Sequence, residues 1–286
     1  MRAILITGVS SGIGKAIAEE LLKTENFIVI GSVRKLEDSE KLKELYPKTF
    51  FSIKFDVTNK QEIEEGKIQV EKIIKENNSY LSCVINNAGI ALGGPIKYLD
   101  VDIFRQQFEV NFFGLIEVTK CFLDLLINSN KYKMKNKIIN IGSISGKRSY
   151  PFVAPYTASK HALEGFNDAL RRELLLHELD VVLIEPGPIR TPIWKKIPDI
   201  EENPFLKTEY ELPLRKFNKG YLKAIEADGF LPSVIGEKIV EIMQTNEPRT
   251  RYVITPKIFK NYLIPGFLPD RFVDKLIGKM LGLIKK

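Results

Sequence analysis

The stretch Thr7-Gly8-Val9-Ser10-Ser11-Gly12-Ile13-Gly14, residues 7–14, decides the fold. It follows a short apolar run, residues 3–7, and leads into a helical pattern over residues 14–24. Glycines at such a junction let the chain turn tightly, and they let backbone N–H groups approach a pyrophosphate at the positive end of a helix. The stretch therefore predicts a dinucleotide-binding turn between a first strand and a first helix. The residues expected to form it are Gly8, Ser10, Ser11, Gly12, Ile13 and Gly14.

Apolar runs of the same kind recur along the chain. Short runs rich in Val and Ile predict strands that are buried on both faces of a parallel sheet. These runs lie at residues 3–7, 27–33, 50–55, 81–86, 137–142, 181–185 and 251–255. Helical patterns lie between them, at residues 14–24, 61–76, 101–126, 155–179 and 232–244. The alternation predicts an α/β fold, a Rossmann-type doubly wound parallel sheet of about seven strands with helices on both faces.

No linker-like run and no internal repeat interrupts this pattern, so we expect a single domain over residues 1–286. Within it, the mixed segment of about residues 190–231 is long enough to form a substrate lid. Residues 256–286 are expected to form a basic amphipathic C-terminal segment.

Composition excludes several classes of protein. The chain has 286 residues, of which 44% are hydrophobic and 28% charged, as in globular proteins rather than disordered or fibrous ones. With two cysteines, Cys83 and Cys121, and two histidines, we expect neither a disulfide framework nor a metal site. The N-terminal residues leave no room for a signal peptide, and no stretch reaches the roughly 18 uninterrupted apolar residues of a membrane span. We therefore expect a cytoplasmic protein, with peripheral membrane contact as an open alternative.

The net charge of +7 is concentrated at the C-terminus. Residues 256–286 hold seven basic and two acidic residues, so residues 1–255 carry only +2. Nucleic-acid binding would require positive charge spread over a folded face, and we expect no such partner. From Arg271 onward, a helix would place apolar residues on one side and bases on the other. It could lie on an anionic membrane, cover the lid or pack on a second subunit, and packing against protein is favoured.

The end of the second predicted strand indicates which dinucleotide binds. An Asp or Glu about twenty residues after the glycines commonly holds the ribose 2′-hydroxyl. Here that position is Val33, and Arg34 follows it. A guanidinium can hold a 2′-phosphate through paired, charge-assisted hydrogen bonds. NADP(H) is therefore favoured, with Arg34 as the clamp, and NAD(H) stays possible if Arg34 only begins a solvated segment.

A tyrosine and a lysine four residues apart indicate acid–base chemistry. Tyr156 and Lys160 would lie on one face of a predicted helix, one turn apart. A free tyrosine has a pKa near about 10, and an ammonium within about 4–6 Å should lower that pKa toward the working range. Ser143, thirteen residues earlier, ends the fifth predicted strand, where a hydroxyl can donate to a substrate carbonyl oxygen. In isolation, a Tyr–Lys pair would more often be a surface pair on an amphipathic helix.

Together these motifs resemble the short-chain dehydrogenase/reductase family. The resemblance rests on the G-x-x-x-G-x-G spacing, on Asn86-Asn87-Ala88-Gly89 and on the Tyr–Lys pair, and it extends over residues 3–191. It implies a catalytic tetrad of Asn111, Ser143, Tyr156 and Lys160, in which Asn111 holds a water that connects the lysine to solvent. It also implies further cofactor contacts from Asp56, Val57, Asn87, Ala88, Gly89, Tyr156, Lys160, Pro186, Gly187, Ile189 and Thr191. Asp56 would bind the adenine amino group, although it could equally cap the helix that starts near Asn59.

The resemblance implies hydride transfer between NAD(P)(H) and a ketone, aldehyde or alcohol, with Tyr156 giving or taking the proton. Within the family, Ala169-Leu170-Arg171-Arg172-Glu173-Leu174 and the later Glu185-Pro186-Gly187 resemble the retinol and hydroxysteroid dehydrogenase branch. Ser145, Leu92, Phe152, Ile193 and Trp194 would lie at the substrate pocket, and their largely apolar character favours a steroid-, retinoid- or lipid-like substrate. We expect a homodimer or homotetramer, as in relatives. The alternatives are a nucleotide-sugar epimerase-like enzyme and a non-catalytic nucleotide-binding or membrane-surface module.

Overall fold

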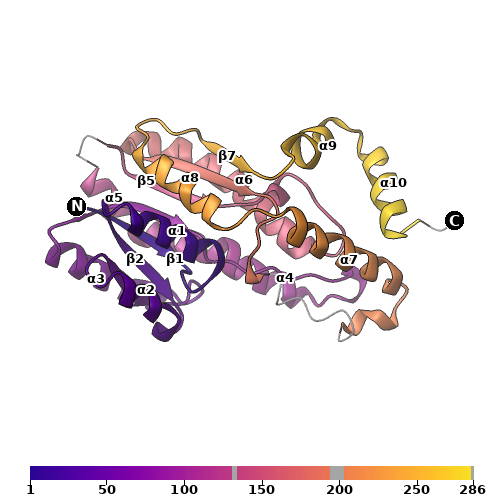
Figure 1. Cartoon of the computed structure of the whole chain (residues 1–286), viewed down its shortest axis with the longest axis horizontal. Coiled ribbons are helices and arrows are strands. Elements are labelled where there is room, and N and C mark those ends of the chain that lie inside the picture. The colour runs from indigo at the N-terminus through magenta and orange to yellow at the C-terminus, as the bar shows by residue number, and fades with distance from the viewer. Residues whose placement is uncertain (131–133, 194–202, 285–286) are drawn as a thin grey trace.

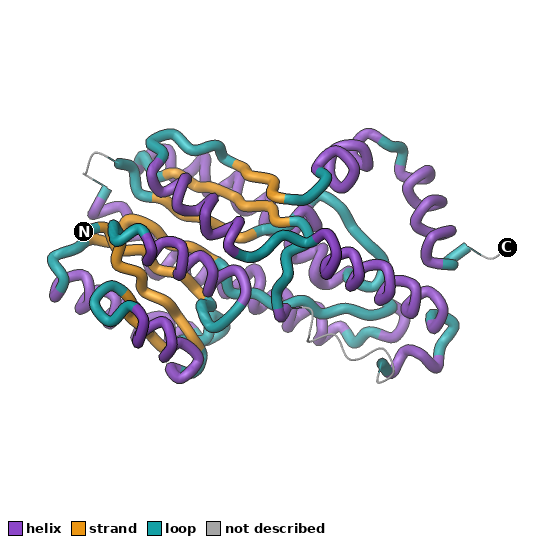
Figure 2. The backbone as a smooth tube through the Cα atoms, in the orientation of Figure 1, coloured by secondary structure: helices purple, strands orange, loops and turns teal. Residues whose placement is uncertain are grey.

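The computed structural model describes residues 1–130, 134–193 and 203–284. A parallel sheet in the order β3-β2-β1-β4-β5-β6-β7 forms its centre (Figures 1 and 2). The strands are β1 (Arg2–Thr7), β2 (Phe27–Val33), β3 (Phe50–Lys54), β4 (Tyr80–Asn86), β5 (Lys137–Ile141), β6 (Asp180–Pro186) and β7 (Arg251–Ile254). The order of the strands reverses between β1 and β4, and in open α/β sheets a ligand binds at the carboxyl ends of the strands next to such a switch.

Helices cover both faces of the sheet, as expected for a doubly wound fold. The longer ones are α1 (Gly12–Lys23), α3 (Lys60–Glu76), α4 (Val101–Phe108), α5 (Gly114–Ser129), α6 (Ala154–Glu173), α7 (Glu211–Asp228), α8 (Ser233–Gln244) and α10 (Asp270–Leu281). Shorter ones are η1 (Leu36–Ser39), α2 (Glu40–Leu45), η2 (Ile96–Tyr98), η3 (Glu109–Phe113), η4 (Ile144–Gly146), η5 (Leu174–His177), η8 (Pro204–Lys207), η9 (Phe259–Leu263) and α9 (Ile264–Phe267). One hydrophobic core joins α1 and α8 to the sheet, and a second joins α3, α5 and the end of α6 to its other face.

Residues of β1 alternate between these two cores. Ile4 and Ile6 pack with the α1 and α8 side, whereas Ala3 and Leu5 pack with the α3 and α5 side, and all four are fully buried. A strand buried on both faces needs apolar residues at successive positions, which explains the continuous apolar runs in the sequence. All seven predicted strands are confirmed, with ends that differ from the prediction by a residue or so.

The helices depart from the prediction in three places. The helix expected over residues 101–126 is interrupted by the π-helical turn η3 and continues to Ser129. The helix expected over residues 155–179 ends at Glu173, and the chain leaves η5 through Glu178 in a left-handed conformation with φ of 53°. The segment predicted as a lid contains a helix, α7, which the sequence did not predict. Trp194, another residue of that segment, lies outside the described residues.

The C-terminal segment lies at the end of the molecule opposite the N-terminus, with α9 and α10 beyond the carboxyl end of β7 (Figure 1). Helix α10 confirms the helix predicted from Arg271 onward. Its Leu281 is 4% exposed and packs with Leu214 and Phe217 of α7. The expected packing against protein is therefore present on the side of α10 that carries Leu281. Among the described residues, no helix is long and apolar enough to cross a membrane.

Candidate active site

A cavity of about 720 Å³ lies at the carboxyl ends of the central strands. It is lined by the glycine turn after β1, by the ends of β2, β4, β5 and β6, and by the start of α6. Predicted site residues that line it are Gly8, Ser10, Ser11, Gly12, Ile13, Arg34, Asp56, Val57, Asn87, Ala88, Gly89, Asn111, Ser143, Ser145, Tyr156, Lys160, Pro186, Gly187, Ile189, Thr191 and Ile193. The structure thus brings the predicted cofactor turn and the predicted catalytic residues into one cavity.

The glycine turn requires glycine for two different reasons. Gly8 and Gly12 have φ of +73° and +60°, in the left-handed region that residues with a Cβ rarely adopt. Gly14 instead needs space, because a Cβ there would lie 2.2 Å from the Gly8 carbonyl oxygen and 2.3 Å from Asn87 Nδ2. Helix α1 begins at Gly12, with no acidic residue in its first turn, so its free N–H groups suit an anion.

The end of β4 holds this turn in place. Asn87 Nδ2 donates to the backbone carbonyl oxygens of Thr7 and Gly8, at 2.9 and 3.0 Å. The backbone N–H groups of Asn87 and Ala88 both donate to Thr7 Oγ1, at 2.9 and 3.0 Å. The Asn-Asn-Ala-Gly motif therefore fixes the glycine turn against the neighbouring strand.

Arg34 and Asp56 lie at the far end of the same cavity. Arg34 follows β2, and its side chain is exposed at the cavity wall, where a phosphate could reach it. Asp56 Oδ1 accepts hydrogen bonds from the N–H and hydroxyl of Thr58, at 2.9 and 2.8 Å. The N-cap of α3 is Asn59, whose side chain accepts from Glu62 N, so the alternative role of Asp56 as that helix cap is wrong.

Tyr156, Ser143 and Lys160 lie close together in the wall of the cavity. All three are buried, with exposed fractions of 8%, 7% and 8%. Ser143 forms a side-chain hydrogen bond with Tyr156, and its Oγ also accepts from Ser145 N at 3.0 Å. Lys160 Nζ lies 5.9 Å from the centre of the Tyr156 ring and donates to the Ile141 carbonyl oxygen at 2.7 Å. The spacing in the sequence therefore places these groups together as predicted.

The pKa of Tyr156 does not follow the prediction. Burial raises the pKa of Tyr156, and the hydrogen bond from Ser143 opposes that rise without cancelling it. Burial also lowers the pKa of Lys160 to about 8. The expectation that the Lys160 ammonium would lower the pKa of the Tyr156 phenol is wrong. Removing the phenolate from water costs more free energy than its neighbours return. Because the pKa of Tyr156 is raised, its phenol keeps its proton at neutral pH.

Asn111 lies in the π-helical turn η3, and it is 2% exposed. Its Oδ1 accepts from Ile90 N at 2.9 Å, while its Nδ2 donates to the Ile90 carbonyl oxygen at 3.0 Å and to Ser159 Oγ at 3.3 Å. The amide thus joins the loop after β4 to the helix that carries the Tyr–Lys pair. Its implied role in holding a water stays a prediction.

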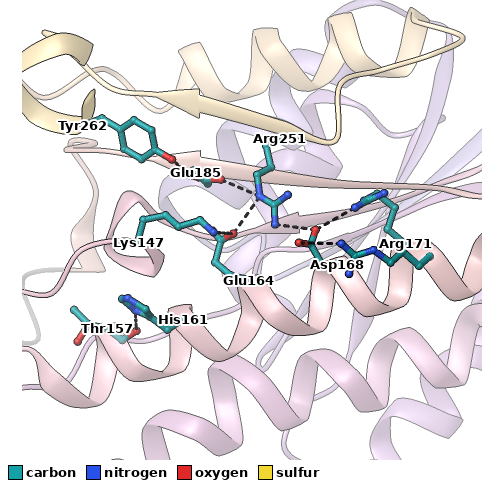
Figure 3. A network of polar contacts seen from close by, with 10 residues as sticks. Lys147, Thr157, His161, Glu164, Asp168, Arg171, Glu185, Arg251 and Tyr262 are labelled. Atoms are coloured by element: carbon teal, nitrogen blue, oxygen red, sulfur yellow. Dashed lines mark hydrogen bonds and ion pairs between the residues drawn. The ribbon is translucent and has the colours of Figure 1, made fainter. Parts of the chain in front are cut away.

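A network of ion pairs connects this helix to β6 and β7 (Figure 3). Arg251 of β7 places its Nε 3.1 Å from Glu164 Oε2 and 3.5 Å from Glu185 Oε1, and its Nη2 2.9 Å from Asp168 Oδ1. Glu164 and Asp168 belong to α6, whereas Glu185 precedes the Pro186-Gly187 loop at the cavity. One guanidinium therefore fixes the catalytic helix and that loop relative to each other.

The carboxylate at the centre of this network is costly to bury. Burial raises the pKa of Glu185, and the neighbouring Glu164 raises it further. The Tyr262 hydroxyl, which comes from the C-terminal segment, donates to Glu185 Oε2 at 3.1 Å. Lys147, which follows η4, lies 2.9 Å from Glu164. Sequence reasoning missed this network, because its members are far apart along the chain.

The other end of the cavity departs from the prediction. Ser145 and Ile193 line it as expected, but Phe152 and Leu92 do not. Phe152 instead packs edge-on against Tyr210 and Phe217, with ring centres 5.9 and 5.7 Å apart. Residues that sequence reasoning missed also line the cavity: Tyr150, Phe217, Met280 and Leu281 are apolar or aromatic, and Lys216, Asp228 and Lys257 are charged.

The fold and the site agree with one class of enzyme, the dinucleotide-dependent oxidoreductases. Residues 2–202 match the family model described as short chain dehydrogenase. The chain belongs to this family.

Its relatives include named reductases. The chain is 40% identical over 281 residues to the NADPH-dependent 3-dehydrocapnine reductase of Ornithobacterium rhinotracheale, a match that covers 98% of each chain. It is 31% identical over 273 residues to the 3-ketodihydrosphingosine reductase of Bacteroides thetaiotaomicron, covering 95% of this chain and 94% of that one. A short chain dehydrogenase from Burkholderia cenocepacia, solved in complex with NADP, shares the fold, with a TM-score of 0.71, 20% identity and 96% coverage of each chain.

Proposed function

We propose that this enzyme uses NADPH to reduce a ketone on a long-chain, lipid-like substrate to an alcohol. The observation that carries the proposal is the buried cluster of Tyr156, Ser143 and Lys160, which lines one cavity together with the glycine turn and with apolar side chains such as Phe217 and Leu281. Two relatives are named as reductases of a 3-dehydro and a 3-keto compound, which agrees with a ketone as the reacting group. Dihydrosphingosine is a long-chain amino alcohol, so we propose a 3-keto long-chain amine as the substrate class.

The residues of the cluster divide the chemistry among them. NADPH, when bound, supplies the hydride. The Tyr156 hydroxyl donates its proton to the carbonyl oxygen as negative charge develops there, and Ser143 donates a hydrogen bond to the same oxygen. Lys160 keeps a positive charge near the phenol and stabilises the phenolate that remains. Because Tyr156 and Lys160 are both buried, water competes little for these contacts.

The walls of the cavity fit NADPH. A cofactor pyrophosphate suits the turn at which Gly8 and Gly12 take left-handed conformations and α1 begins. Asp56 and Val57 line the neighbouring wall, which suits the adenine, and Arg34 lies beside it. The exposed guanidinium of Arg34 is the group that would distinguish a 2′-phosphate from a 2′-hydroxyl.

Replacing Arg34 by leucine is expected to lower kcat/KM for NADPH roughly 10- to 100-fold, as for the loss of a charged hydrogen-bond pair. The value for NADH should change less than threefold, because NADH has no 2′-phosphate for the guanidinium to bind (about 0.6 kcal/mol at most). Lys35→Leu is the matched control, since Lys35 is also exposed and basic but does not line the cavity. Equal losses for both cofactors, or a natural preference for NADH, would contradict the role given to Arg34.

The substrate class is tested with a panel of ketones and either cofactor. 3-Ketodihydrosphingosine and 3-dehydrocapnine are expected to drive NADPH oxidation, and retinal, a steroid ketone and a short-chain 3-keto amine less so. The apolar side chains at the end of the cavity, among them Ile193 and Phe217, explain the expected gain from a long chain. A short-chain ketone that reacts as fast as its long-chain analogue would disprove the lipid-like class but leave the reductase chemistry standing.

The pH dependence should separate the two directions of the reaction. Since the pKa of Tyr156 is raised, ketone reduction should be independent of pH from about 6 to about 7.5. Above a pH of about 8, Lys160 loses its proton, the phenolate loses its stabilising charge, and reduction should slow. Alcohol oxidation needs the phenolate, so its rate should be low at neutral pH and rise as pH increases. Initial rates in both directions measure this, and reduction that accelerates above pH 8 would contradict it.

We also propose the remaining features predicted from the sequence as properties of this enzyme. Residues 1–286 would form one cytoplasmic domain, with a lid at about residues 190–231 to which α7 belongs. The enzyme would assemble as a homodimer or homotetramer. Light scattering of the purified chain measures that assembly directly.

A further inference from the structure

Exposed apolar side chains gather in the C-terminal segment. They include Phe259 at 69% exposure and Phe267 at 86%. Among the described residues, others in this segment are Ile264, Phe272, Leu276 and Met280, all more than half exposed. Single exposed apolar residues are normal on a protein surface, but such a run along one segment is typical of an interaction surface.

Helix α10 arranges its twelve residues in four parallel rows, each with a spacing of four. The first row, Val273, Ile277 and Leu281, is at least partly buried and runs along the protein. The second row, Phe272, Leu276 and Met280, is apolar and 55%, 57% and 61% exposed. The third row, Arg271, Lys275 and Lys279, is basic and exposed. The fourth row, Asp270, Asp274 and Gly278, carries two exposed acids, and its Asp274 also lines a second cavity between α10 and the start of α6.

An exposed apolar row beside a basic row matches the interface of an anionic bilayer. Apolar side chains of such a helix enter the membrane by about 5–10 Å, and the bases beside them reach the lipid phosphates. The two acids on α10 that could repel those phosphates, Asp270 and Asp274, lie in the fourth row, and the helical rotation of about 100° per residue places that row opposite the exposed apolar row. The segment also lies at one end of the molecule, clear of the sheet (Figure 1).

A second copy of the chain fits this surface less well. In a twofold dimer, the same surface of both subunits meets, so contact between two α10 helices would bring two basic rows together. Such like charges repel, and few acids are available nearby to offset them, since residues 256–286 contain only Asp270 and Asp274 as acids. Anionic lipid offers the opposite charge along the whole row.

We infer that the exposed apolar row of α10, with its basic row, docks this enzyme on the surface of an anionic membrane. The end of that row lies at the catalytic cavity, because Met280 is exposed and also lines the cavity together with Leu281. Docking therefore places the apolar end of the cavity next to the bilayer. This last consequence, that a lipid-like ketone can pass from the membrane into the site, rests on the proposed function; the docking does not.

Vesicle flotation with the full-length protein tests the docking. We expect binding to vesicles of phosphatidylcholine with about 30 mol% phosphatidylglycerol to exceed binding to phosphatidylcholine alone at least about tenfold. Because exposed charges are screened by salt, the difference should shrink at about 0.5 M NaCl. Equal binding to both vesicles, or no binding to either, would overturn the inference.

Paired variants identify the surface. Phe272→Asp/Leu276→Asp is expected to lower vesicle binding at least about tenfold, because it places acids in the apolar row. Leu175→Asp/Leu176→Asp is the matched control, since these residues are 68% and 83% exposed in η5, outside the segment. Lys275→Glu/Lys279→Glu should abolish the preference for anionic lipid, and Lys41→Glu/Lys43→Glu on α2 should not. Equal effects of test and control pairs would overturn the inference.

Two further measurements separate membrane docking from misfolding and from self-association. NADPH binding without vesicles should be unchanged in every variant, which shows that the variants are folded. If Phe272→Asp/Leu276→Asp instead converts an oligomer to a monomer in light scattering, a second copy covers this face and the inference is wrong. Vesicle binding and ketone reduction are measured separately, so failure of the docking leaves the proposed reductase activity testable, and the reverse also holds.

Discussion

Tyr156→Phe is expected to lower kcat for ketone reduction about 10³-fold, within the range of about 10²–10⁴ for loss of a general acid. The change removes the hydroxyl that donates the proton and keeps the ring that packs beside Lys160. Ser143 Oγ retains its hydrogen bond from Ser145 N, so the local structure should persist. The KM for NADPH should change less than threefold, equivalent to about 0.6 kcal/mol, because the phosphate-binding turn is untouched. Loss of NADPH absorbance measures the rate.

Tyr150→Phe is the matched control for this experiment. Tyr150 lines the same cavity, so this change also removes a phenolic hydroxyl from that cavity. Tyr150 is not part of the cluster that Ser143, Tyr156 and Lys160 form. Its kcat should stay within about threefold of the natural enzyme, a barrier change of less than about 0.7 kcal/mol. If Tyr156→Phe keeps a tenth of its activity, or if Tyr150→Phe is equally impaired, Tyr156 is not the proton donor.

The cofactor half of the site could be predicted because its residues are local in the sequence. Gly8, Gly12 and Gly14 follow a strand of six residues, and conformation and space at each position leave little choice but glycine. The same holds for Tyr156 and Lys160, because helical geometry alone places them one turn apart. Strand positions were predictable for a related reason, since burial on both faces leaves a continuous apolar run.

The substrate half could not be predicted, because it depends on contacts between distant segments. Phe217 and Met280 reach the cavity from α7 and α10, which lie far beyond the catalytic helix in the sequence. Phe152 has a left-handed conformation with φ of +69°, which residues with a Cβ rarely adopt, so its sequence did not indicate the direction of its side chain. The predicted direction of the Tyr156 pKa shift was wrong for a physical reason. A sequence shows how far Lys160 lies from Tyr156 along a helix, but it does not show how deeply the two side chains are buried.

The interruption of the helix at Asn111 could be predicted only in part. The apolar pattern over residues 101–126 predicts one continuous helix, and nothing in it marks the extra residue of a π turn. The amide itself was a signal, because a buried Asn within an apolar helix must find partners. It finds them in both backbone groups of Ile90, which a local pattern cannot specify.

Gly14→Ala is expected to destabilise the fold and to weaken NADPH binding, although it adds only a methyl group. The new Cβ would lie 2.2 Å from the Gly8 carbonyl oxygen, so the turn or α1 must move. Overpacking of this kind costs about 1–3 kcal/mol, and the hydrogen bonds from Asn87 to Thr7 and Gly8 would be strained as well. We expect a loss of about 3 kcal/mol in the free energy of unfolding, measured by urea titration. The Kd for NADPH should rise at least about 100-fold, because the phosphate-binding N–H groups are displaced.

Gly165→Ala provides the comparison that separates the crowded position from the general effect of a methyl group in a helix. Gly165 lies within α6, and a Cβ there would meet nothing within 4 Å. Alanine at an open helical position should therefore stabilise the protein by about 0.5–1 kcal/mol and leave NADPH binding unchanged. The two variants add the same atom to a helical glycine and are expected to change stability in opposite directions. If both are stabilising, the close approach of α1 to the β1 turn is relaxed in solution, and Gly14 does not set the geometry of the phosphate site.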